Sequence, residues 1–156
     1  MTTFYLIGQI TTHPETYAWR QRMRDRFIEE KEIKLIDPCN HEFSRRCLKE
    51  ADDGNFRKVA SFNAASAILP VRDAQYVMQS DGAIANLNWY TPETPLLGTF
   101  FELAWYKMQP WKTVIGIFDG DPNQDYICYH PFVKSTVNVW VRNEEEAGDI
   151  LVDLFL

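Results

Sequence analysis

The sequence predicts an α/β fold, namely a single doubly wound, flavodoxin- or Rossmann-like domain with a five-stranded, mainly parallel sheet. Strand-like apolar runs alternate with helical patterns along the chain, as they do in layered α/β domains. The runs 4–10, 82–87 and 113–118 are almost continuously apolar, which is typical of parallel strands covered on both faces. No linker, repeat or low-complexity stretch divides the chain, so we expect residues 1–156 to form one domain.

The chain begins with a strand, a helix and a second strand. The run 4-FYLIGQI-10 is rich in β-forming residues and is expected to form a buried strand that ends at Gly8. An amphipathic helix is predicted from about 14 to 31, and 33-IKLIDP-38 predicts a second strand stopped by Pro38.

The next region, 39–67, is polar at first and is interpreted as a long excursion over the sheet edge. A short helix is expected over 71–80, because Val71, Ala74, Val77 and Met78 share one face at helical spacing.

The second half continues the alternation to the end of the chain. The predicted elements are a strand at 82–87, a loop at 88–97, a helix at 98–107, a strand at 113–118, a loop at 119–125, a strand at 136–141 and a last helix from Asn143. Ligands of open parallel sheets bind at the carboxyl ends of the strands. That rule places Gly8, Gln9, Asn86 to Asn88, Gly98, Thr99 and Asp119 along one candidate rim.

Charge and composition exclude several classes of partner. The net charge of −6 argues against nucleic acid, and the arginines at 20, 22, 24 and 26 spread around a helix axis without forming a stripe. We expect a cytoplasmic protein without a membrane partner, because the sequence shows neither a signal-peptide pattern nor an apolar run of about 18 residues.

The cysteines predict reduced thiols. There are three of them, Cys39, Cys47 and Cys128, and no pair has CxxC spacing. Cys39, Cys47, His41 and His130 could meet in space, but their spacing does not demand zinc. No metal and no cofactor are expected.

Glu102 stands out because it lies inside the aromatic run 98-GTFFELAW-105. One interpretation is an acid placed near a helix N-terminus for its dipole. The other is a carboxylate that Phe100, Phe101 and Trp105 partly desolvate while the dipole keeps it ionised, which suits a nucleophile toward a sugar carbon.

Several stretches, in order along the chain, carry a family resemblance. They are 5-YLIG-8, 72-RDAQYVMQSDGAIANLN-88, 98-GTFFELAW-105, 114-VIGI-117 and 129-YHPFV-133. In sequence and spacing the chain resembles the nucleoside 2-deoxyribosyltransferase family, together with its relatives that hydrolyse nucleotide N-glycosidic bonds. The resemblance covers most of the chain and is weakest between 39 and 67.

The resemblance implies roles for three residues. Glu102 would attack the sugar C1′ and form a covalent glycosyl-enzyme intermediate. Asp73 would hydrogen-bond the nucleobase and carry its proton, although an N-cap of the 73–80 helix is an equally good interpretation of this residue. Tyr5 would hydrogen-bond and orient the nucleophile, and it could also be an ordinary aromatic residue of the first strand.

The substrate pocket departs from the family pattern before Gly98. Many members carry an acid there that contacts the sugar hydroxyls, whereas this chain has Leu96 and Leu97, and Glu93 or Asn88 are the candidates for that role. Gly8, Gln9, Gly98 and Thr99 complete the expected substrate-binding set on this chain.

A phosphate on the substrate would need a cation or a cradle of hydroxyl groups, for which Arg20, Thr11 and Thr12 are candidates. The resemblance also implies that a segment of a neighbouring subunit completes the pocket in a homo-oligomer. His130 and Phe132 in 129-YHPFV-133 would supply it, and the apolar end 150–156 could pack in the subunit contact or in the core.

We therefore expect a pentosyltransferase that moves deoxyribose from one nucleobase to another. The first alternative is an N-glycosidase that hydrolyses a nucleoside or nucleoside 5′-monophosphate with the same glutamate, and the second is a non-catalytic nucleotide-sensing module. The aromatic residues Trp89, Tyr90, Phe100, Phe101 and Trp105 would favour transfer over hydrolysis by keeping water out.

Overall fold

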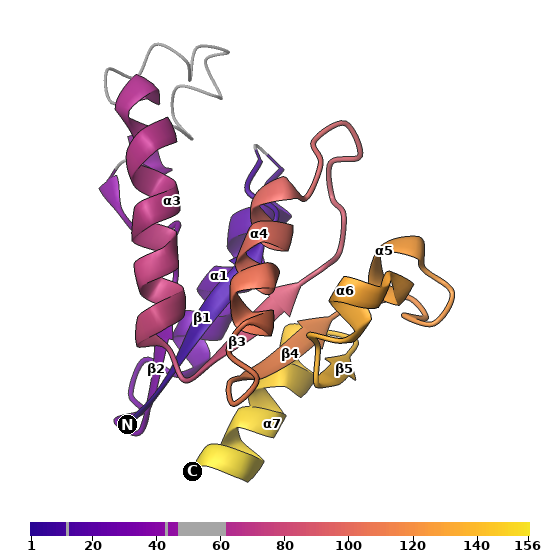
Figure 1. The fold of residues 1–156 in the computed structure, drawn as a ribbon. Helices are drawn as coiled ribbons and strands as arrows, with labels where there is room; N and C mark the ends of the chain where they lie inside the picture. Colours follow the sequence, from indigo (N-terminus) through magenta and orange to yellow (C-terminus); the bar gives the residue numbers. More distant parts are fainter. Residues whose placement is uncertain (12, 43, 47–61) are drawn as a thin grey trace.

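The computed structural model describes residues 1–11, 13–42, 44–46 and 62–156, with the backbone alone for 62–66. Its centre is a five-stranded sheet made of β1 (Thr2–Gly8), β2 (Ile33–Ile36), β3 (Gly82–Asn86), β4 (Thr113–Ile117) and β5 (Val139–Val141). All neighbouring strands pair in parallel, in the order β2-β1-β3-β4-β5 (Figure 1). This is the flavodoxin-like order, so the predicted fold class is confirmed.

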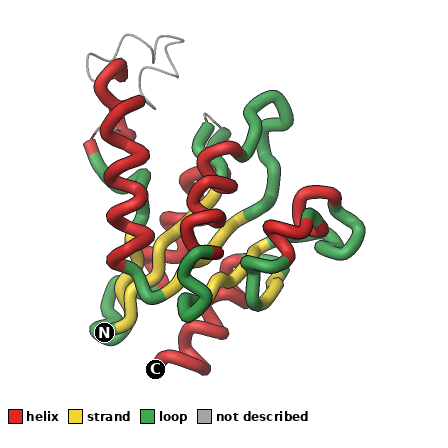
Figure 2. The backbone as a smooth tube through the Cα atoms, in the orientation of Figure 1, coloured by secondary structure: helices red, strands yellow, loops and turns green. Residues whose placement is uncertain are grey.

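Helices cover both faces of the sheet (Figures 1 and 2). They are α1 (Glu15–Arg26), α3 (Phe62–Gln79), α4 (Leu97–Lys107), α5 (Tyr126–Tyr129), α6 (Pro131–Lys134) and α7 (Glu144–Phe155). The last helix begins as predicted, because the Asn143 side chain accepts a hydrogen bond from the Glu146 amide at 2.9 Å. None of the helices in the described part of the chain has the length and apolar character needed to span a membrane.

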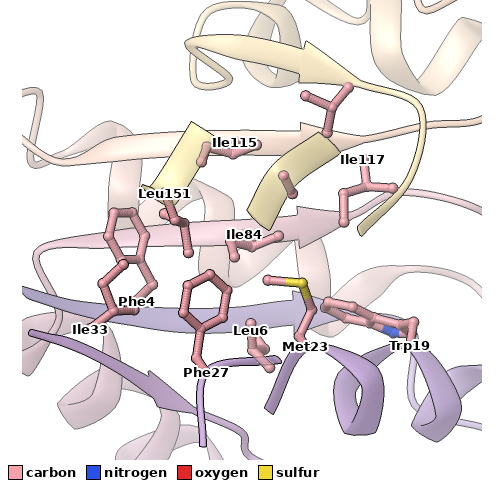
Figure 3. Close-up of a cluster of buried hydrophobic side chains, with 12 residues drawn as sticks. Phe4, Leu6, Trp19, Met23, Phe27, Ile33, Ile84, Ile115, Ile117 and Leu151 are labelled. Carbon is pink, nitrogen blue, oxygen red and sulfur yellow. The ribbon is translucent and has the colours of Figure 1, made fainter. Parts of the chain in front are cut away.

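The alternation of side chains along the strands builds a core on each face. On one face, Phe4 and Leu6 of β1 pack with α1 and α7 through Trp19, Met23 and Leu151 (Figure 3). On the other face, a second set of buried side chains packs beneath α3, α4, α5 and α6. It includes Tyr5, Ile7, Val77, Ala83, Leu103, Tyr106, Cys128 and Val133. The second face holds Tyr5, one of the candidate site residues.

The helix predicted at 71–80 is present as the second half of α3, but its short length was wrong, because α3 begins at Phe62 and continues through Pro70. A proline removes one backbone donor and usually marks a helix boundary, so the sequence signal pointed to a start after it. The predicted face was also wrong, since Val77 is buried whereas Val71 and Met78 are 60% and 71% exposed. Part of the predicted loop at 39–67 lies outside the described residues.

Other boundaries differ from the prediction at the ends of elements. Helix α1 ends at Arg26 and not near residue 31. The fifth strand is confined to Val139–Val141 and does not begin at residue 136. The Thr136 hydroxyl donates to the Phe132 carbonyl, and the Thr136 amide donates to the Val133 carbonyl. These two hydrogen bonds hold Thr136 in the turn after α6.

Gly82 is the glycine whose replacement should perturb the sheet most clearly. A Cβ there would lie 2.5 Å from Cε1 of Phe4 and 2.6 Å from the backbone oxygen of Thr113. Overpacking of this kind costs about 1–3 kcal/mol, so we expect Gly82→Ala to lower the free energy of unfolding by that amount in urea denaturation. Gly98→Ala is the matched control, because a Cβ at Gly98 meets nothing within 4 Å. Equal stabilities of the two variants would contradict the packing described here.

Candidate active site

The carboxyl ends of β1 and β3 form the switch point of the sheet, where the chain connections diverge to opposite sides. Gly8 at the end of β1 pairs in register with Asn86 at the end of β3. A buried arginine lies against this point, since Nη2 of Arg20 donates to the Gly8 carbonyl at 2.9 Å and Nη1 to the carbonyls of Gln9 and Thr16. Arg20 is therefore committed to the backbone and is not available to a substrate phosphate, contrary to one expectation from the sequence.

Arg20 also belongs to a buried charge cluster. Asp37, which follows β2, is 1% exposed in its side chain and forms ion pairs with Arg20 and Arg24. The Arg20 Nε to Asp37 Oδ1 distance is 3.8 Å, so this contact is electrostatic and not a hydrogen bond. The cluster neutralises buried charge and fixes the loop after β1.

Glu102 and Tyr5 form a buried hydrogen bond on the face covered by α3 and α4. The Tyr5 hydroxyl donates to Oε1 of Glu102 at 2.5 Å, across 97 residues of sequence. Tyr5 is 0% exposed in the middle of β1, and Glu102 is 9% exposed on the buried face of α4. In the described part of the chain no other group hydrogen-bonds the Glu102 carboxyl, so its Oε2 has no donor there.

Burial controls the protonation of Glu102. It raises the pKa of the carboxyl to about 8, with a contribution from the negative charge of Asp73, while the Tyr5 hydrogen bond and the cations Arg20 and Arg72 lower the pKa. The expectation of a carboxylate kept ionised by the helix dipole was therefore wrong. Glu102 lies five residues after Leu97, the first residue of α4, and the dipole acts mainly within the first turn. Phe101 does not desolvate it, being 64% exposed.

Tyr5 stays a proton donor in this setting. Its own burial raises the pKa of the phenol, and the charges of Glu102 and Asp73 raise it further. A neutral phenol can hold Oε1 of Glu102 whether the carboxyl is ionised or protonated.

Asp73 lies on α3 and its charge acts on both Tyr5 and Glu102. Because it sits inside a helix that begins at Phe62, its interpretation as an N-cap was wrong. Its Oδ1 accepts two hydrogen bonds from Arg72, from Nε at 2.9 Å and from Nη2 at 2.7 Å. Burial raises the pKa of the Asp73 carboxyl, and the Arg72 hydrogen bonds oppose that rise.

The segment after β2 brings His41 and Cys39 to the same cluster. Nε2 of His41 accepts a hydrogen bond from Nη1 of Arg72. Desolvation and the neighbouring Arg72 charge lower the pKa of His41, so the ring is neutral and can accept. Burial raises the pKa of the Cys39 thiol, which is a protonated, buried neighbour of the site.

Sequence reasoning had not assigned Arg72 and His41 to the site. Arg72 was visible as the residue before Asp73, but nothing in the sequence linked it to His41. His41 had been considered only as a possible zinc ligand. Among the described residues no group of three His, Cys, Asp or Glu side chains could hold a metal, and Cys47 lies outside them.

Three of the predicted substrate-binding residues have structural roles. The Gln9 side chain is 4% exposed and hydrogen-bonds the carbonyls of Thr91 and Thr94 and the amide of Thr91, so it holds the 88–97 loop. Asn88 accepts a hydrogen bond from the Asp119 amide at 3.0 Å. A Cβ on Gly8 would lie 3.1 Å from the Asn86 oxygen, so Gly8 permits close packing.

The start of α4 differs from a tight glycine turn. The helix begins at Leu97, one residue before Gly98, and the N-cap position is Leu96, whose side chain cannot accept a hydrogen bond. Gly98 is exposed and leaves open space around its Cα, whereas Thr99 is 3% exposed on the same helix face as Glu102. Gly98 can therefore admit a ligand to the helix end.

His130 and Phe132 lie at a separate groove of about 610 Å³ between α4 and the α5–α6 segment. The groove is lined by Phe100, Leu103, Ala104, Lys107, Met108, Tyr126, Ile127, His130, Phe132, Val133 and Thr136. Glu102, Asp73 and Tyr5 do not line it. Within one chain the structure thus brings together Glu102, Tyr5 and Asp73 but not His130 and Phe132.

Tyr5→Phe tests the electrostatics of this cluster. The hydrogen bond from Tyr5 lowers the pKa of Glu102, so its removal should raise that pKa above the present value of about 8. Carboxyl ¹³C NMR titration of the Glu102 side chain measures the shift directly. A lower Glu102 pKa in Tyr5→Phe would contradict the donor role of the phenol.

Comparison with known proteins shows the fold. No protein-family model and no curated protein matches the chain. Among solved structures, a conserved protein from Enterococcus faecalis V583 is similar, with a TM-score of 0.67 and 15% identity over 98% of both chains. At this identity the likeness supports the α/β architecture over the whole chain.

Proposed function

We propose that the chain is a nucleoside 2-deoxyribosyltransferase, which moves deoxyribose between nucleobases through a covalent intermediate on Glu102. The observation that carries the proposal is the buried Tyr5–Glu102 hydrogen bond, with Asp73 close enough to influence both groups. A carboxyl in an apolar setting, oriented by a donor and next to a second acid, is the arrangement that glycosyl transfer needs.

Before the first half-reaction the one proton shared by the two acids must move from Glu102 to Asp73, and Oε2 of the Glu102 carboxylate then attacks C1′ of the nucleoside. The C1′–N bond breaks, its electron pair goes to the base nitrogen, and that nitrogen takes a proton from Asp73. In the second half-reaction a new base attacks C1′, loses its proton to Asp73 and releases the Glu102 carboxylate. Tyr5 holds Oε1 throughout, which leaves Oε2 as the reacting oxygen.

Hydrolysis is the second candidate, with water in place of the incoming base. The observation in its favour is the exposure of two aromatics expected to exclude water, since Trp89 is 44% and Phe101 64% exposed. Without a cover over the site, water can reach the glycosyl ester.

A homo-oligomer belongs to the same proposal. Phe132 and Tyr126 are 75% and 82% exposed beside the groove along α4, and Phe101 is exposed on the same helix. A second copy of the chain over this surface would bury them and could bring its His130 and Phe132 toward Glu102 of the first. Light scattering in solution tests this, and a strictly monomeric active protein would contradict it.

The test of function is an incubation with deoxynucleosides, ribonucleosides and their 5′-monophosphates, with and without a second free base. Chromatography separates exchanged nucleoside from free sugar. Base exchange supports the transferase, and free sugar regardless of added base supports the hydrolase. Absence of both products with every substrate would contradict the proposal and leave the nucleotide-sensing module as the alternative.

A further inference from the structure

The guanidinium of Arg72 is held from several directions at the edge of the candidate site. Its Nε and Nη2 both donate to Oδ1 of Asp73, at 2.9 and 2.7 Å, and its Nη1 donates to Nε2 of His41. Its Cζ lies 5.4 Å from the centre of the Tyr76 ring, one turn further along α3. The Tyr76 ring in turn lies 5.8 Å from the ring of Tyr5.

The bonding pattern treats the two oxygens of Asp73 differently. Both Arg72 donors reach Oδ1, and in the described part of the chain no donor reaches Oδ2. Two charge-assisted hydrogen bonds to one oxygen fix the position of Oδ1 and leave Oδ2 as the oxygen without a donor. The same contact favours the ionised form of Asp73, which is the form that receives a proton from an incoming base.

His41 completes the arrangement from outside α3. As a neutral acceptor it takes the Arg72 N–H that points away from Asp73. A neutral imidazole accepts at one nitrogen only, so Nδ1 of His41 then carries the ring proton. The guanidinium is thereby tied to the segment after β2 as well as to its own helix.

We propose, on the premise of the function above, that Arg72 is a positioning residue for the proton transfer. It clamps Oδ1 of Asp73 so that Oδ2 is the oxygen that exchanges a proton with the base nitrogen, and His41 supports it. Arg72 acts through Asp73 and need not touch the substrate. In the first half-reaction its effect should therefore appear only where the leaving group needs a proton.

The experiment compares two leaving groups. A nucleoside needs protonation of its base, whereas 4-nitrophenyl 2-deoxyriboside releases a stable anion without a proton. In single-turnover measurements of the first half-reaction, we expect Arg72→Met to lower the rate of base release from the nucleoside by about 10- to 100-fold, the cost of a misplaced catalytic group, and to change the rate of nitrophenolate release by less than about threefold. Arg72→Lys should rescue little, because an ammonium cannot form the paired contact.

Further variants distinguish a positioning role of Arg72 from a general loss of structure. Asp73→Asn should show the same leaving-group pattern, and Arg72→Met should add little to it in the double variant. Arg22→Met, which removes an exposed arginine with two ion pairs, is the control. Equal losses on both substrates, or independent losses in the double variant, would overturn the positioning role.

A readout without turnover keeps this inference distinct from the proposed function. Carboxyl ¹³C NMR of the free protein should show a higher pKa for Asp73 in Arg72→Met than in the wild type. An unchanged Asp73 titration in an active protein overturns the role of Arg72 alone. A wild type inactive on both substrates overturns the proposed function, and the positioning role falls with it, even if the titration shifts.

Discussion

Glu102→Gln is expected to abolish glycosyl transfer and, at the same time, to stabilise the protein at alkaline pH. The amide has the shape of the carboxyl and can still accept the Tyr5 hydrogen bond, but it cannot form the glycosyl ester. Loss of a covalent nucleophile costs roughly 10⁴- to 10⁶-fold in kcat. The residual rate of Glu102→Gln should therefore be near the detection limit of the chromatographic assay.

The stability gain follows from the raised pKa of Glu102, which is about 8 in the folded protein. An unfolded glutamate ionises near its ordinary value of about 4.3, so between that pH and 8 the unfolded chain loses a proton that the folded protein keeps. The folded state is destabilised as pH rises through this window, and above pH 8 the penalty is constant. Glu102→Gln removes this penalty, which we expect to be on the order of 5 kcal/mol at pH 9 and well below 1 kcal/mol near pH 4.5.

Urea denaturation of wild type and variant across this pH range measures the gain. Glu30→Gln, a change of an exposed glutamate, is the control for the loss of one negative charge and should show no such pH dependence. A Glu102→Gln variant less stable than the wild type at pH 9 would mean that the buried carboxyl is ionised and compensated in the folded protein.

Arg20→Met should cause the largest loss of stability among single changes near the site. Arg20 is 0% exposed, and its removal leaves Asp37 buried with Arg24 as its remaining cation. It also removes the donors to the carbonyls of Gly8 and Gln9. Breaking a buried pair from one side costs about 3–5 kcal/mol, and the remaining Arg24 contact favours the lower end of that range.

Two comparisons test the origin of this loss by urea denaturation. Arg22→Met removes an exposed arginine from the same helix and should cost less than about 1 kcal/mol. Adding Asp37→Leu to Arg20→Met should recover part of the stability, because the under-compensated buried charge is then absent. A double variant less stable than Arg20→Met would show that Asp37 contributes through its other contacts.

Strand prediction succeeded because it rests on local information. Buried parallel strands need continuous apolar runs, and 82–87 and 113–118 contain the observed β3 and β4. Prediction failed at the boundaries of two elements, where the residue pattern gave the wrong signal. Helix α3 continues through Pro70, and the expected start of the fifth strand belongs to a turn held by hydrogen bonds from Thr136 to Phe132 and Val133.

In the candidate site, too, some features could be predicted from the sequence and others could not. The sequence, with its family resemblance, selected Glu102, Tyr5 and Asp73, which the structure brings into one cluster. It did not predict that Gln9 and Arg20 are bound to backbone groups, since the partners of a polar side chain depend on the fold. The protonation of Glu102 was mispredicted for the same reason, because desolvation is a property of the folded protein and not of neighbouring residues in sequence.

The central claim is a glycosyl-enzyme ester on Glu102, and its direct test is trapping by mass spectrometry. A 2′-fluoro nucleoside serves as the trap, because the electronegative fluorine destabilises the oxocarbenium-like transition state and slows release of the sugar. We predict an intact-protein mass increase equal to one fluorinated pentosyl group, located by proteolysis to the peptide containing Glu102 and absent in Glu102→Gln. An adduct on another residue, or turnover of ordinary deoxynucleosides by Glu102→Gln at the wild-type rate, would contradict the account.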